Sequence, residues 1–119
     1  MDINHLKIIQ TIVHYSCHFI VPFFIAYFGF RVKWKYVYTI LIATMFVDLD
    51  HLFANPIFDP CRCSVGFHYL HSYYAIFFYI VLYFSKNATF KYISIGLLFH
   101  MATDFQDCLW ISYINSLTK

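Results

Sequence analysis

The sequence has 119 residues, which is enough for one domain. Hydrophobic residues make up 61% of it and charged residues only 12%, against about 25% charged in an ordinary soluble domain, so the charge is too low to cover a soluble surface. The net charge of +2 and the lack of a basic stripe exclude nucleic-acid binding through a charged face. We therefore expect an integral membrane protein.

The first apolar run covers residues 8–30, and a helix of about 20 residues is enough to cross a bilayer. Pro22 lies inside this run and is expected to kink it. The run is too long for the hydrophobic part of a signal peptide, and no small-residue cleavage site follows it. We predict that residues 8–30 form the first transmembrane helix.

Three more apolar runs follow, at about 36–54, 67–85 and 90–114. The stretch after the second run begins with Asn55-Pro56 and carries Cys61 and Cys63, which indicates a loop. Together the four runs predict an all-α fold, with residues 1–119 forming a single bundle of about four transmembrane helices.

Lysine and arginine residues near the helix ends predict the orientation. With four spans, the turns at 31–35 and 86–91 share one side and hold five of these eight residues. This side is expected to be cytoplasmic, so both termini and the 55–70 loop would face outward from the inner (plasma) membrane. There, Cys61 or Cys63 could form a disulfide, whereas we interpret Cys17 and Cys108 as small packing residues.

Most histidines and aspartates lie in or beside the apolar runs. A carboxylate at membrane depth costs a few kcal/mol or more, so such residues indicate a binding function. Because neighbouring helices alternate in direction, the pairs from all four runs fall within roughly 5–20 Å of one membrane face, at about 1.5 Å per residue. The pairs are His14/His18, Asp48/His51, His68/His71 and His100/Asp104.

Each pair is separated by three or four residues, which places both side chains on one face of a helix. Each helix can therefore direct two ligands to one interior point. Asp50 is out of phase with Asp48 by about 200° on an ideal helix, so it binds a metal only if the helix end unwinds near Asn55-Pro56. Otherwise Asp50 orients a histidine or faces the outer interface.

Histidine and carboxylate ligands together suit zinc, our first expectation, or iron or manganese. The donors outnumber those of one four-coordinate ion, so either two ions are held or some aspartates orient the histidines. Asp50 and Asp104 are the candidate catalytic carboxylates, because the sequence has no glutamate. Ser72 is interpreted as a capping or packing residue. The candidate metal ligands are His14, His18, Asp48, His51, His68, His71, His100 and Asp104.

In this order the motifs resemble those of small bacterial inner-membrane proteins described as LexA-regulated, membrane-bound metal-dependent hydrolases. The D-x-D-H motif of that family corresponds to residues 48–51, and its H-x-x-x-D motif to residues 100–104. The first-helix histidine corresponds to His14 or His18. The H-R-G-x-T-H-S motif is present only in part, at residues 68–72. The resemblance implies a metal-dependent hydrolase of the inner membrane.

The expected function is hydrolysis of a lipid or other amphipathic ester, including phosphoesters, by a metal-activated water. Two alternatives stay open: a membrane di-iron oxidoreductase similar to desaturases and hydroxylases, and a non-enzymatic metal or proton transporter. A transport path needs polar groups at several depths, whereas these lie near one face. The expected partners are the membrane and the substrate, without nucleic acid, and homo-oligomerisation through aromatic faces also stays open.

Overall fold

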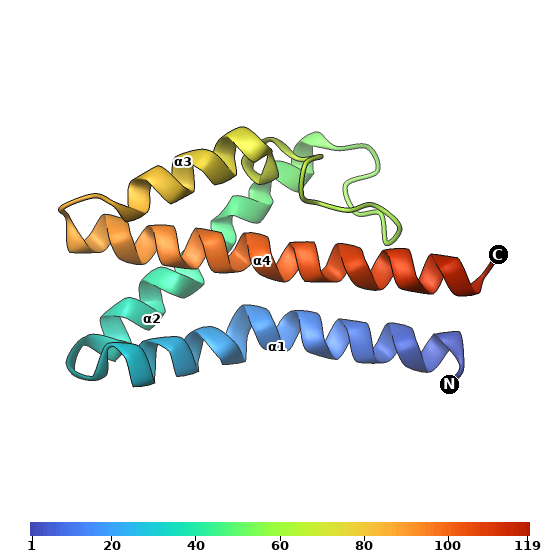
Figure 1. The fold of residues 1–119 in the computed structure, drawn as a ribbon, viewed down its shortest axis with the longest axis horizontal. Coiled ribbons are helices and arrows are strands. Elements are labelled where there is room, and N and C mark those ends of the chain that lie inside the picture. Colours follow the sequence, from blue (N-terminus) through green and yellow to red (C-terminus); the bar gives the residue numbers. More distant parts are fainter.

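The computed structural model describes all 119 residues and contains only helices and their connections (Figure 1). Helix α1 spans Ile3–Gly29, and a 3-10 turn, η1, at Arg31–Lys33 leads into α2, Trp34–Ala43. Helix α2 continues without a break as a 3-10 helix, η2, over Thr44–Phe53. The prediction of an all-α fold is confirmed.

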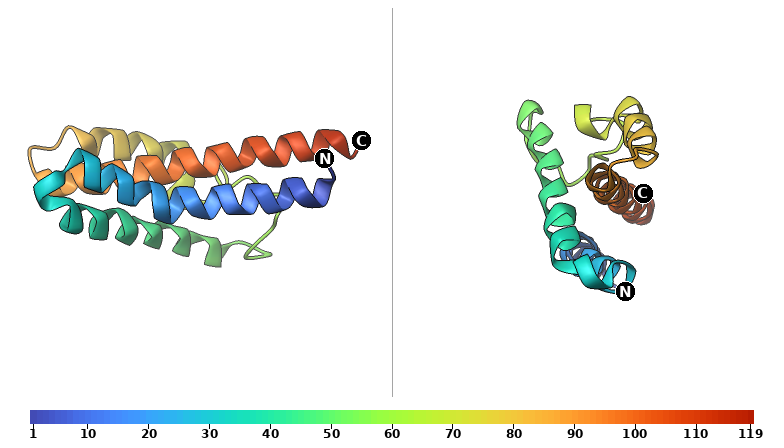
Figure 2. Two further views of the ribbon diagram at one scale, coloured as in Figure 1. Left: turned by 90° about the horizontal axis from the view of Figure 1, so that it is seen from below. Right: turned by 90° about the vertical axis from the view of Figure 1, so that its left-hand side faces the viewer.

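A long connection over residues 54–68 separates η2 from the second half of the chain. It is followed by a 3-10 turn, η3, at Tyr69–His71, by α3, Tyr73–Tyr83, and by α4, Ala88–Leu117. Helix α4 contacts α1, α2, η2 and α3 and is therefore the centre of the bundle. Both termini lie at one end, and the α1–α2 and α3–α4 turns lie at the other (Figures 1 and 2).

The third helix is shorter than predicted. Residues 67–85 were expected to be helical, but α3 begins only at Tyr73, so His68 and His71 precede it. The hydroxyl of Ser72 accepts a hydrogen bond from the backbone N–H of Ala75 at 3.2 Å. This N-cap interaction starts the helix and confirms the capping role expected for Ser72.

The second predicted helix changes its winding at Thr44, and this change decides which side chains of η2 are buried. A 3-10 helix has three residues per turn, so residues three apart lie above one another. The buried residues of η2 are Thr44, Val47 and Asp50, which follow this spacing. The winding therefore buries Asp50, while the side chain of Asp48 stays 37% exposed.

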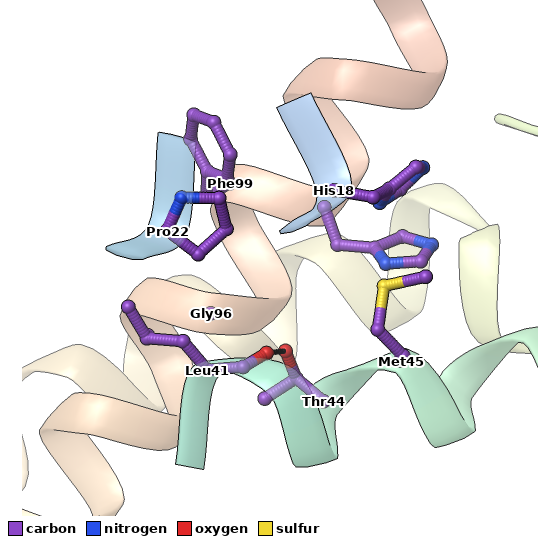
Figure 3. A pocket seen from close by; sticks show the side chains of 8 residues that line it. His18, Pro22, Leu41, Thr44, Met45, Gly96 and Phe99 are labelled. Atoms are coloured by element: carbon purple, nitrogen blue, oxygen red, sulfur yellow. Dashed lines mark hydrogen bonds between the residues drawn. The ribbon is translucent and has the colours of Figure 1, made fainter. Parts of the chain in front are cut away.

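Helices α4 and η2 approach each other closely at Gly96. A Cβ atom there would lie 2.7 Å from Cγ2 and Oγ1 of Thr44, so a larger residue would push the two helices apart. Figure 3 shows Thr44 beneath Gly96, with its hydroxyl bonded to the carbonyl oxygen of Leu41 at 2.6 Å. This crossing holds the η2 aspartates against the middle of α4.

The interior is polar and the surface is apolar. Only 19 of 119 residues are buried, and nine of those are polar or charged. Large apolar side chains are exposed along α3 and at its C-cap, including Tyr74, Phe77 and Phe84. Two helical segments, Ile3–Gly29 and Arg31–Phe53, are long and apolar enough to cross a membrane. The buried polar residues are His18, Thr44, Asp50, His68, His71, Ser94, His100, Thr103 and Asp104.

Candidate metal centre

Four side chains from η2, η3 and α4 converge in the middle of the bundle, namely Asp48, His71, His100 and Asp104. The atoms that meet are both histidine Nε2 atoms, Oδ1 of Asp48 and Oδ2 of Asp104. Five distances among these four atoms run from 2.9 to 3.4 Å. His71 and His100 are fully buried. We name these four residues the central site.

The geometry of the central site fits a tetrahedral metal ion. With bonds of about 2.0–2.1 Å, neighbouring ligand atoms on such an ion lie about 3.3 Å apart. The Nε2 atoms of His71 and His100 face each other at 3.4 Å. Their ring centroids are 5.4 Å apart, close to the value of about 5 Å for two imidazoles on one tetrahedral ion. These four residues, of which all but Asp48 are buried, could therefore hold a divalent ion with little movement.

Asp50 orients His71 from the far side of the imidazole ring. Its Oδ2 accepts a hydrogen bond from Nδ1 of His71 at 2.9 Å and another from the backbone N–H of Leu70 at 2.8 Å. Because Nδ1 donates to this carboxylate, Nε2 carries the free lone pair, and this lone pair faces the central site. Asp50 does not line the cavity described below. Its position suits the orienting role rather than the predicted catalytic one.

Asp104 faces two groups of histidines with its two oxygens. Its Oδ2 lies 2.9 Å from His71 and 3.3 Å from His100, whereas its Oδ1 lies 3.3 Å from Nε2 of His18. The ring of His14 is next to that of His18 on α1, with centroids 4.4 Å apart. We name His14, His18 and Asp104 the α1 site; one potential ligand atom from each lies within 4.8 Å of the others.

His51 and His68 lie beside the central site and not in it, contrary to the expectation that all pairs converge on one point. Their rings stack with centroids 3.9 Å apart. Nδ1 of His51 lies 3.2 Å from Oδ1 of Asp50, and its Nε2 lies 3.3 Å from the hydroxyl of Ser64. Burial lowers the pKa of His68, and the charge of neighbouring His51 lowers it further. Asp50, His51 and His68 form a third group that could hold an ion, but Asp50 is already bonded to His71.

A cavity of about 590 Å³ connects the metal centre with the end of the bundle that holds the termini. Asp48 and Asp104 line its inner part, whereas Lys7 and Thr118 line it near the chain ends. Residues 58–62 of the long connection cover one side. Most lining side chains are polar or charged, so the cavity suits water and a polar ligand.

The space on the other side of the centre is much smaller. A cavity of about 10 Å³ lies next to His18 and His100, which is barely room for one water molecule. Pro22, Leu41 and Phe99 close it toward the helix turns (Figure 3). The centre therefore opens widely toward one end of the bundle only.

A disulfide joins Cys63 in the long connection to Cys108 on α4. The expectation of a disulfide at Cys61 or Cys63 is met by Cys63, but the interpretation of Cys108 as a packing residue is wrong. Cys108 lies one helical turn beyond Asp104, so the bond holds the connection against the ligand-bearing part of α4. Cys61 and Cys17 are free.

Two polar residues of this region were not predicted from the sequence. The hydroxyl of Ser64 contacts His51, and the side-chain amide of Gln10 donates to Oδ1 of Asp107 at 2.8 Å. Neither residue belongs to a pair at helical spacing, which was the signal that identified the ligands. Both line the larger cavity.

A family model matches residues 8–111, which include every candidate ligand and both disulfide cysteines. The chain belongs to a family of unknown function (DUF6122). No curated protein and no solved structure matches it. Membership of DUF6122 assigns no activity, so the function of the chain has to be argued from its own residues.

Proposed function

We propose that this DUF6122 protein is a membrane-embedded, metal-dependent hydrolase whose central site binds a divalent ion, most simply zinc. The observation that carries the proposal is the convergence of His71, His100 and the two aspartates at tetrahedral spacing, with Asp50 behind His71. A carboxylate that orients a metal-ligating histidine is a recurrent feature of metal centres. The motif resemblance to membrane-bound metal-dependent hydrolases supports the reaction class.

The bilayer position follows from the apolar surface and from the basic residues. At about 1.5 Å per residue, α1 and α4 are about 40 and 45 Å long, enough to cross a membrane, whereas α3 is about 16 Å long and crosses only half of it. The long connection and η3 complete this part of the bundle, where irregular backbone is tolerated because it lines a cavity. Helix α3 is therefore a half-span in this proposal.

Five of the eight lysines and arginines lie at or near the two helix turns, and no aspartate lies there. The excess of positive charge favours that end as cytoplasmic. The termini, the long connection and the cavity mouth then face outward. The Cys63–Cys108 disulfide agrees with this orientation, because disulfides persist in oxidising compartments.

A bound divalent ion would supply a Lewis acid and lower the pKa of water toward 7. The chain's own residues hold and shape the site: Asp50 orients His71, and Asp48 and Asp104 supply negative charge facing the ion position. The polar cavity would admit water and the head of a lipid or amphipathic (phospho)ester, while its apolar part stays in the bilayer. Lys7 and Arg62 line this cavity and, together with the ion, would offset the charge of the four aspartates that also line it.

The one-sided cavity favours an enzyme over a transporter. A transport path has to continue past the metal centre, but the space beyond His18 and His100 measures only about 10 Å³. Pro22, Leu41 and Phe99 border it without offering a side-chain ligand, and the hydroxyl of Thr44, which also lines it, donates to the carbonyl oxygen of Leu41. A site that is open to substrate at one end needs no such continuation.

Elemental analysis of the detergent-purified protein tests this function. We expect zinc or manganese in the wild type. His100→Ala and Asp48→Ala should each lose the ion of the central site and the hydrolysis of fluorogenic carboxylic and phosphoric esters. His5→Ala, at an exposed position of α1, is the matched control. Full metal content in both ligand variants would contradict the ligand assignment. Iron with a visible absorption band, and no hydrolysis, would favour the oxidoreductase.

A further inference from the structure

We propose that the protein holds two divalent cations, the second at the α1 site, bound by His14, His18 and Asp104. This inference rests on the proposed function of the central site and extends it to a dinuclear centre. Imidazole nitrogens and a carboxylate oxygen are donors that suit zinc, manganese or iron. Four observations support the second ion.

The first observation is the placement of Asp104 between the two groups of histidines. One oxygen faces His71 and His100, and the other faces His18, whose side chain is only 3% exposed. A carboxylate in this position can bind one ion with each oxygen. Two-metal hydrolytic centres hold their ions about 3.5–4 Å apart, a separation that one bridging carboxylate spans.

The second observation is an unsatisfied ring nitrogen. Nδ1 of His14 is buried and makes no hydrogen bond. The oxygen of Asp107 lies 3.8 Å from it, which is too far for a hydrogen bond. A buried polar atom without a partner costs about 1–3 kcal/mol. An ion of the α1 site that His14 binds through this nitrogen would remove that cost.

The third observation is the balance of charge. All nine ion pairs of the molecule join a histidine to an aspartate, and no lysine or arginine pairs with a carboxylate. Four carboxylates take part in these pairs, so four negative charges are compensated only by protonated histidines or by metal. Two divalent ions compensate all four and leave the histidines neutral, the form that coordinates. The carboxylates are Asp48, Asp50, Asp104 and Asp107.

The fourth observation is access. His14 and His18 line the larger cavity, whereas His71 and His100 do not. The second ion would therefore be in contact with the solvent that fills the cavity, and the first would be held by buried histidines. We expect the ion of the α1 site to exchange faster and to be removed first by a chelator.

Metal stoichiometry tests the second site on the full-length protein in detergent, loaded with Mn²⁺ and washed. We expect two ions per chain in the wild type and one in His14→Ala and His18→Ala. His5→Ala, on the same helix but exposed, should keep two. Electron paramagnetic resonance should show an exchange-coupled pair in the wild type and an isolated ion in His18→Ala. His18→Asp, which restores a ligand, should restore the second ion.

The possible outcomes separate this inference from the proposed function. One uncoupled ion in the wild type, retained in His18→Ala, would overturn the second site and leave the central site intact. Loss of both ions in His18→Ala but two coupled ions in His18→Asp would still support it, because a ligand at position 18 would then be required. A wild type that binds no ion would contradict the proposed function itself.

Discussion

Asp50 is the residue whose substitution most directly tests how the central site is held. Its Oδ2 accepts hydrogen bonds from both His71 Nδ1 and the Leu70 N–H, and its Oδ1 lies 3.2 Å from Nδ1 of His51. That His51 nitrogen also lies 3.0 Å from the carbonyl oxygen of Asp48, so it must be a donor. This N–H donates to Asp48, and Oδ1 of Asp50 accepts no hydrogen bond, but an NH₂ group in the place of Oδ1 would face the N–H at close range.

Asp50→Asn keeps the side-chain size but places an NH₂ group against at least one N–H donor. If the amide oxygen stays with His71, the NH₂ group faces His51. If the amide flips, the NH₂ group faces Nδ1 of His71 and turns the imidazole ring of His71. Loss of an orienting partner of this kind lowers metal affinity about 10–100-fold, which is about 1.4–2.7 kcal/mol. Since Asp50 is 3% exposed, water cannot replace the lost acceptor.

Zinc affinity is measured by competition with a chromophoric chelator in detergent, in the His18→Ala background so that only the central site reports. Asp2→Asn makes the same chemical change at an exposed position and should leave the affinity unchanged. Circular dichroism checks that the helices persist. Wild-type affinity in Asp50→Asn, together with loss of zinc in His71→Ala, would refute the reasoning, because His71 would then coordinate without its carboxylate.

Three further predictions concern the disulfide, the contact at Gly96 and the orientation in the membrane. Cys63→Ser and Cys108→Ser should each lower the unfolding free energy by up to about 4 kcal/mol, which is the chain-entropy value for a sequence separation of 45 residues. When unfolding is measured by denaturation in detergent, the double variant should lose no more unfolding free energy than either single variant. Gly96→Ala should cost about 1–3 kcal/mol because its Cβ would meet Thr44 at 2.7 Å. Added Thr44→Ala should recover part of this loss, and Gly29→Ala, with no atom within 4 Å of its Cβ, should show none. Finally, a membrane-impermeant maleimide added to spheroplasts should label the wild type at Cys61. It should not label Asn87→Cys in a background that also carries Cys61→Ser; the reverse pattern would contradict the proposed orientation.

The ligand pairs on α1 and α4 could be predicted because both helices are regular. A spacing of four residues places His14 with His18, and His100 with Asp104, on one face wherever the helix begins and ends. The structure brings these two faces together at Asp104. Helical periodicity alone was therefore enough to identify half of the metal centre.

The winding of η2 could not be predicted in this way. The α-helix and the 3-10 helix differ by about 20° per residue, but the apolar residues of 44–53 are not confined to one face in either winding, so their pattern does not distinguish the two. The winding is accompanied by tertiary contacts, namely the close approach of Thr44 to Gly96 and the bond from Asp50 to the Leu70 N–H. His68 and His71 do not point to one site, because both precede α3. Their spacing of three residues therefore does not place them on a common helix face.

The buried apolar core of the bundle is small. One buried apolar cluster, Ala26, Val37 and Leu41, joins α1 to α2 near the turns, and a second, Val47, Tyr79 and Met101, joins η2, α3 and α4. Toward the termini, Leu6 and Ile114 are the buried apolar residues beyond these clusters.

In that half of the bundle the buried contacts between segments come mainly from the His/Asp groups and the disulfide. A buried carboxylate whose charge is not compensated costs several kcal/mol, and the only charged partners of these carboxylates within the chain are histidines. In the proposed metal-bound form, the free energy of metal binding would contribute directly to the free energy of folding. In this proposal the metal ligands also form the core of one end of the bundle, and the substrate would enter at that same end.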